Sequence, residues 1–183
     1  MEVFNMTALI KTYDKPFRAR IMLALEAVLE EITIADGYSK DMTGAVLWGR
    51  VRYDENDPLP MISLLEPPVP PDWSNAAGSK VVGDGNWPLL VQGFVKDDYE
   101  RPTEEAYFLA ADAKRRLALE KFRDRGQDIL GMGPRNNNGS GNAVLDMFIG
   151  SEVIRPSDEQ SSKAFFWLPL TLKITENHLQ PYS

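Results

Sequence analysis

Residues 164–175 read AFFWLPLTLKIT, and apolar side chains occupy every second position of this stretch. One face would carry Phe166, Leu168, Leu170, Leu172 and Ile174, and the other Trp167, Thr171 and Lys173. A period of two with one apolar face predicts a β-strand that lies on a hydrophobic core. Because Pro169 has no N–H for a neighbouring strand, we expect this strand at a sheet edge or at a bulge.

The first predicted helix covers residues 14–32. Asp14 is its expected N-cap, and Pro16 suits its first turn. Spacings of three and four residues create an apolar stripe of Phe17, Ile21, Ala24, Leu25, Val28, Leu29 and Ile32. Asp36 and Gly37 then supply a turn in which Gly37 is free to adopt a positive φ.

The second predicted helix covers residues 103–123. Thr103 is expected to cap it, and Gly126 is expected to end it. Its buried stripe consists of Ala106, Leu109, Ala110, Ala113 and Leu117. Glu104 and Glu105 lie in the first turn, where the helix dipole favours negative charge.

Further strands are predicted at residues 45–53, 61–65, 87–96 and 144–149. In the first of these, the more apolar face is expected to pack on the helix; it consists of Leu47, Gly49, Val51 and Tyr53. Successive strand pairs favour an antiparallel or mixed sheet with two amphipathic helices on one face. The sequence therefore predicts an α+β fold with long surface loops, in a single domain spanning residues 1–183.

The composition excludes several classes of chemistry. The 183 residues include no cysteine, which excludes disulfides, zinc–thiolate sites and thiol catalysis. The single histidine, His178, lies near the C-terminus and is expected to be a solvated tail residue. The formal net charge is −7, whereas nucleic-acid-binding proteins usually carry a basic face. No membrane span and no secretory signal are predicted, so we expect synthesis in the cytoplasm.

Two segments contain residue types that catalysis or cofactor binding would use. The loop GMGPRNNNGSGN, residues 131–142, has neither the spacing of a P-loop nor that of a dinucleotide-binding loop. Asp97, Asp98 and Glu100 could serve acid–base work or hold magnesium, but capping and solvated turn residues have the same composition. No cofactor site is predicted, and a small metal-dependent hydrolase using these acids is a remote alternative.

Two polar segments are the predicted contact surfaces. Residues 66–86 form a proline- and glycine-rich excursion, and residues 131–142 form a flexible loop rich in glycine and asparagine. Aromatic residues and arginine contribute most of the binding energy at interfaces. Trp73 and Arg135 are therefore the expected anchors, with Asn136 and Asn137 beside Arg135.

The order of several short motifs resembles the tail terminator proteins (tail-completion or minor tail proteins) of tailed bacteriophages. RIMLALEAVLEEITIADGYSKDMTGAVLWGR, residues 20–50, shows an amphipathic helix, an Ile-Thr-x-Ala-x-Gly-Tyr junction, an acidic spacer and a Val-x-x-Gly-Arg strand. DPLPMISLLE, residues 57–66, resembles the strand that usually follows. VLDMFIGSEVIRPSDEQSSKAFFWLPLTLKIT, residues 144–175, resembles the closing hairpin. The resemblance covers about two-thirds of the chain, and residues 66–86 depart from it.

The resemblance implies a structural virion protein rather than an enzyme. Such proteins form a ring, usually hexameric, at the head-proximal end of the tail, where they end tube growth and provide the docking surface for head connector proteins. The implied partners are further copies of the chain, the tail tube protein, the head connector or neck protein and, in a contractile phage, the tail sheath. DNA would pass through the lumen without specific binding, and no membrane is involved. The implied location is the virion tail, assembled in the host cytoplasm, and another neck or tail-tube component is the alternative.

Overall fold

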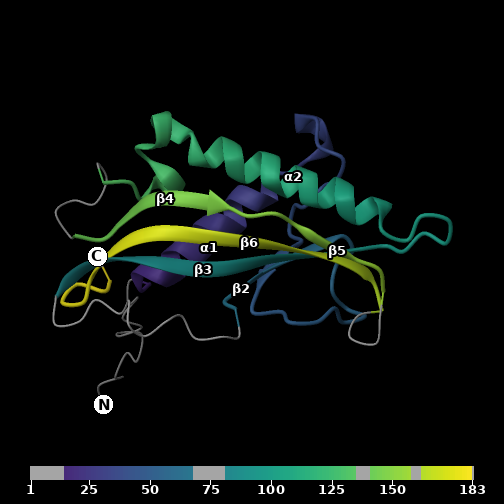
Figure 1. The fold of residues 1–183 in the computed structure, drawn as a ribbon, viewed down its shortest axis with the longest axis horizontal. Coiled ribbons are helices and arrows are strands. Elements are labelled where there is room, and N and C mark those ends of the chain that lie inside the picture. Colours follow the sequence, from purple (N-terminus) through teal and green to yellow (C-terminus); the bar gives the residue numbers. More distant parts are fainter. Residues whose placement is uncertain (1–14, 68–80, 135–140, 158–161, 183) are drawn as a thin grey trace, which may run out of the picture.

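The computed structural model describes residues 15–67, 81–134, 141–157 and 162–182. Its fold consists of one mixed sheet of six strands and two α-helices (Figure 1). The helices are α1 (Phe17–Glu30) and α2 (Glu104–Lys121). The strands are β1 (Val46–Trp48), β2 (Met61–Leu65), β3 (Val82–Val95), β4 (Ala143–Ile149), β5 (Val153–Arg155) and β6 (Ala164–Asn177). The short 3₁₀ turns are η1 (Ile34–Asp36), η3 (Arg123–Gly126) and η4 (Ile129–Gly131). The predicted α+β class is confirmed.

The longest ladder of the sheet joins β3 to β6. The two strands pair antiparallel over their whole length, from Val82 opposite Asn177 to Val95 opposite Ala164. The strand order is β1-β2-β3-β6-β4, and β5 pairs with β6 beyond the end of β4. β1 and β2 are parallel, whereas the other described pairs are antiparallel.

The prediction that Pro169 places its strand at a sheet edge is wrong, because β6 has neighbours on both sides. The Pro169 carbonyl accepts a hydrogen bond from the Gly150 N–H at 2.8 Å. Since the nitrogen and carbonyl of a strand residue face the same side, the missing donor of Pro169 also faces this side. The position without an N–H faces the gap between β4, which ends opposite Leu170, and β5, which begins opposite Trp167. Pro169 therefore does not interrupt β6; the break lies between the two strands that pair with it.

One face of the sheet forms the main core with both helices, as predicted (Figure 1). β6 contributes five side chains that are at most 2% exposed, which confirms the predicted alternation: Phe166, Leu168, Leu170, Leu172 and Ile174. α1 adds Phe17, Ile21, Leu25, Val28 and Leu29, and α2 adds Ala106, Leu109, Ala110, Ala113 and Leu117.

The predicted strand 45–53 is shorter than expected and faces the other way. β1 ends at Trp48 because Gly49 adopts a left-handed conformation with φ of 79°. Val46 lies in the main core, whereas Leu47 lies on the opposite face of the sheet against a small cluster of Met61, Phe94 and Phe165. The loop that follows supplies Tyr53 and Leu59 to this second cluster.

The helix ends also differ from the predicted caps. Asp14 lies outside the described residues, and α1 starts after Pro16, with the Phe17 N–H donating to the Pro181 carbonyl at 2.8 Å. Thr103 makes no side-chain capping bond; its backbone carbonyl accepts from the first turn of α2 instead. α2 ends at Lys121, and Gly126 closes the following η3 turn with φ of 77°.

β3 begins five residues earlier than the predicted 87–96 strand, so the excursion 66–86 ends in regular structure. Asp84, Gly85 and Asn86 have low strand propensity, but each pairs with a residue of β6. A long partner strand thus overrides the local preference. Most of the rest of the excursion, residues 68–80, lies outside the described residues.

The junction after α1 is fastened to α2. Gly37 has φ of 80°, which confirms the predicted turn. The Ser39 N–H and hydroxyl both donate to the Asp112 carboxylate, at 2.8 and 2.5 Å. The Arg115 guanidinium lies 4.6 Å from the centroid of the buried Tyr38 ring. The junction therefore fixes α2 as well as returning the chain to the sheet.

Gly93 gives the first test of the fold. It pairs with Phe166, and a Cβ added there would overlap the Phe166 ring. We expect Gly93→Ala to lower the free energy of unfolding by about 1–3 kcal/mol, measured by urea denaturation. Gly85→Ala on the same strand is the matched control, because its added Cβ meets no atom within 4 Å. Equal stability of the two variants would contradict the close packing of β3 against Phe166.

Candidate functional site

The four predicted contact residues, Trp73, Arg135, Asn136 and Asn137, lie outside the described residues. Their role stays a prediction. The described ends of the 131–142 loop are both fixed to the body of the protein. At its far end, the Asn142 side chain donates to the Gln180 carbonyl at 2.7 Å and accepts from the Asn177 N–H at 2.8 Å.

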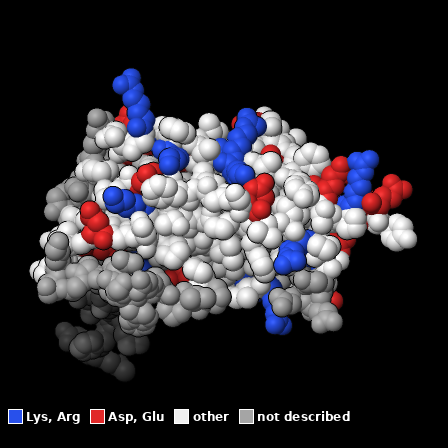
Figure 2. All heavy atoms as spheres, viewed as in Figure 1, with Lys and Arg blue, Asp and Glu red and all other residues white. Residues whose placement is uncertain are grey.

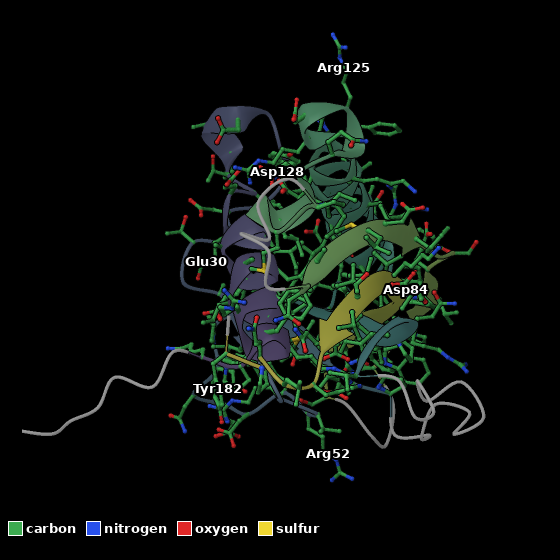
Figure 3. The ribbon with its side chains drawn as sticks, turned by 90° about the vertical axis from the view of Figure 1, so that its left-hand side faces the viewer. Glu30, Arg52, Asp84, Arg125, Asp128 and Tyr182 are labelled. Atoms are coloured by element: carbon green, nitrogen blue, oxygen red, sulfur yellow. The ribbon has the colours of Figure 1, made fainter. Side chains whose placement is uncertain are left out.

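The near end of the same loop is held by a buried carboxylate. Glu120 is 3% exposed, and it accepts from the Leu130 N–H at 2.9 Å and from Arg116 and Arg123 at 3.3 Å each. Leu130 has φ of 57°, which is unusual for a branched residue. The bond from Glu120 thus supports a backbone conformation that the Leu130 side chain disfavours. The adjoining η3 turn carries Arg125, whose side chain extends away from the body (Figure 3).

Two of the three candidate catalytic acids accept hydrogen bonds from the backbone. The Asp97 carboxylate accepts from the Ala164 N–H at 2.5 Å, at the start of β6. The Asp98 carboxylate accepts from the Glu100 and Arg101 N–H groups at 2.8 and 3.0 Å. In the described part of the chain, no group of three or more histidine, aspartate or glutamate side chains is placed to hold a metal ion.

These acids instead shape a projecting loop, residues 97–101, which we call the tip. It extends past the end of the sheet, between β3 and α2 (Figure 1). Tyr99 is 100% exposed at its centre. Asp98 fixes the backbone, and an ion pair at 2.8 Å joins Arg101 to Glu104 of α2. The sequence showed Tyr99 only as part of an acidic turn, although an aromatic residue flanked by charges signals contact.

A groove of about 550 Å³ lies beside the middle of α2. Its lining consists of Lys114, Arg115, Ala118, Ile149, Gly150 and Ser151. Lys114 pairs with Glu152 at 2.6 Å, which lowers the pKa of that carboxyl below its ordinary value. Arg115 donates to the Gly37 carbonyl at 3.1 Å, and no described carboxylate pairs with it. We call this the α2 groove; no sequence motif predicts it, because its walls are about 30 residues apart.

A second concave surface, of about 370 Å³, lies between α1, the end of β2 and β3. Its lining includes Trp48, Trp87, Met22, Leu64 and Arg18. Trp87 is 3% exposed, and its indole N–H has no hydrogen-bond partner among the residues that the structure describes. Arg18 lies 5.0 Å from the Trp87 ring and forms a two-bond ion pair with Glu176. A buried and a partly exposed tryptophan, Trp87 and Trp48, thus lie at one surface.

The sheet face opposite the helices is not covered by any helix of the described residues. The cluster around Phe94 covers one end of this face. Toward the other end it presents Leu90, Pro169 and Thr171, and at the β4 edge Phe148 is 49% exposed. We call it the open face. Lys121 reaches across the outer edge of β4 and donates to the Met147 carbonyl at 2.7 Å.

Glu120 gives a prediction about the loop 131–142. Glu120→Gln removes the charge that Arg116 and Arg123 need, so we expect a loss of about 2–4 kcal/mol in the free energy of unfolding. Glu26→Gln is the matched control. One Glu26 oxygen is buried without a hydrogen-bond partner in the described part of the chain, and desolvation followed by the charge of Glu30 raises the pKa of this carboxyl. Loss of that charge should leave stability unchanged or raise it. A stable Glu120→Gln protein would contradict the anchoring role.

Asp98 gives a prediction about the tip. Hydrogen bonds from the N–H groups of Arg101 and Glu100 lower the pKa of the Asp98 carboxyl below its ordinary value of 3.8. Above the ordinary pKa of 3.8 the carboxylate is charged and these bonds are fully present. They are lost as the pH falls through the pKa of the folded state, which is lower. NMR amide shifts of Glu100 and Arg101 should therefore titrate below pH 3.8. Asp98→Asn should abolish the titration, and a normal midpoint would refute the proposed bonds.

Comparisons with known proteins do not assign a family. No protein-family model matches the chain, and its sequence matches no curated protein. Within the described residues, no helix is long and apolar enough to cross a membrane. A functional proposal therefore rests on the motif order in the sequence and on the surfaces described above.

Proposed function

We propose that the chain is a tail terminator of a tailed bacteriophage. In this role it forms a ring, hexameric by resemblance, on the head-proximal end of the tail tube. The ring ends tube growth and provides the docking surface for head connector proteins. The chain acts in the virion tail through contacts with its own copies, the tube protein and the connector, and it carries out no catalysis.

The observation that carries the proposal is the one-sided construction of the sheet. Both helices pack on one face, and the open face presents Leu90, Pro169 and Phe148 without a described helix above them. A sheet normally buries its apolar surface against another layer. Neighbouring chains in a ring can supply that layer, and a virion protein whose work is assembly needs such surfaces.

The charge distribution agrees with a lumen through which DNA passes. The chain carries a net charge of −7. Acidic and basic side chains are interspersed over the face that Figure 2 shows, rather than gathered into a single basic field. Tight DNA binding requires such a basic field, because release of counterions from the phosphates drives it. A ring built from this chain would therefore let DNA pass without holding it.

Phage tails assembled without this chain give the direct test. If the ring ends tube growth, tails made without it should be longer than normal in negative-stain micrographs. Supplying the chain from a plasmid should restore the normal length, which is the control. Tails of normal length would refute the terminator role. If the purified chain alone forms open-ended tubes, the tail-tube alternative replaces the proposal.

A further inference from the structure

The tip is built to present one aromatic side chain to a partner. Tyr99 is fully exposed, whereas the backbone around it is fixed by Asp98 and by the Arg101–Glu104 ion pair. Presenting a preformed loop reduces the conformational entropy lost on binding. Glu100 adds a carboxylate for which the structure shows no side-chain bond or ion pair in the described part of the chain. The tip is therefore a fixed aromatic knob with negative charge.

The α2 groove has the opposite charge. Arg115 donates to the Gly37 carbonyl and lies over the Tyr38 ring, but no described carboxylate pairs with it. Lys114, which pairs with Glu152, also lines the groove. Ala118 and Ile149 supply apolar surface between the cation and the β4–β5 connection. A surface of this composition can hold a phenol ring, because the face of the ring attracts cations and its body is apolar.

The two surfaces cannot meet within one chain. The tip precedes α2 and projects away from it beyond the end of the sheet (Figure 1). The groove begins at Lys114, ten residues past the start of α2 at Glu104, a separation of about 15 Å in the opposite direction. Complementary surfaces that face apart on one chain can be satisfied by a second copy.

We propose that the tip of one copy occupies the α2 groove of the next, with Tyr99 as the anchor and Glu100 facing Arg115. The inference rests on the proposed ring and specifies its contact between neighbours. A knob and a groove are unlike surfaces, so the contact is head-to-tail, which is the kind that closes a ring. A connector or tube protein in the groove is the competing occupant.

Two variants remove one side of the contact each. Tyr99→Ser removes the knob, and Ala118→Arg fills the groove while keeping a good helix former. Sedimentation velocity should show the dissociation constant of self-assembly rising about 30-fold or more for each. Tyr182→Ser is the matched control, because Tyr182 is 52% exposed and lies away from the tip. Thermal melting of each variant, compared with the unaltered chain, shows whether it still folds.

Mixing the two variants separates this contact from any symmetric one. Each variant alone has one intact surface, so an equimolar mixture should form one-to-one dimers and no larger species.

Ser151→Asp places a like charge against Glu100, and Glu100→Lys should restore assembly in the double variant. This pair also covers the case in which Ala118→Arg fails to fold.

The outcomes distinguish the contact from the ring. If Tyr99→Ser and Ser151→Asp assemble like the unaltered chain, the tip–groove contact is wrong while the ring remains. A mixture that stays monomeric also overturns the contact. If the unaltered chain stays monomeric at every concentration and also in the presence of isolated tail tubes, both the contact and the ring are refuted. Binding of connector or tube protein that Ala118→Arg abolishes, with self-assembly intact, assigns the groove to that partner instead.

Discussion

The ladder between β3 and β6 is the constraint on which the other elements depend. Its fourteen-residue strands pair without a break, and both present alternating apolar residues to the helices. β2 and β1 attach to one side of the ladder, and β4 and β5 attach to the other. At Gly93 the two strands pack closely, because an added Cβ would overlap the ring of Phe166. Without this ladder, neither helix would have a surface to cover.

Polar contacts then fix α2 in place over the core that the ladder creates. Ser39 binds Asp112, Arg116 bridges Glu31 and Glu120, and Lys114 pairs with Glu152. These bonds reach α2 from the junction after α1, from the end of α1 and from the β4–β5 connection. Exposed pairs of this kind contribute little stability individually, but together they define one orientation. The position of the tip relative to the α2 groove follows from that orientation.

Sequence periodicity predicted the parts of the fold in which burial alternates regularly. It located both helices, β2 and the buried face of β6, because their apolar spacing reflects a single packed face. It failed for the start of β3, where Asp84 and Asn86 are held by a partner strand rather than by their own preference. It also gave β1 the wrong face, because three residues carry too little pattern. The α2 groove escaped prediction since it depends on which distant segments meet, whereas Tyr99 lies in a local turn whose full exposure the sequence pattern does not report. The roles of Trp73, Arg135, Asn136 and Asn137 stay predictions.

The break at Pro169 has a consequence for the surface above it. Residues 150–152 stand opposite only two residues of β6, so the chain bulges outward between β4 and β5. Gly150 and Ser151, at the crest of that bulge, form one wall of the α2 groove. The missing N–H of Pro169 thus faces the extra residue of this bulge. Because three residues face two here, β4 and β5 are out of register with each other across the gap, so the extra residue, and not the missing N–H alone, keeps them from forming one strand.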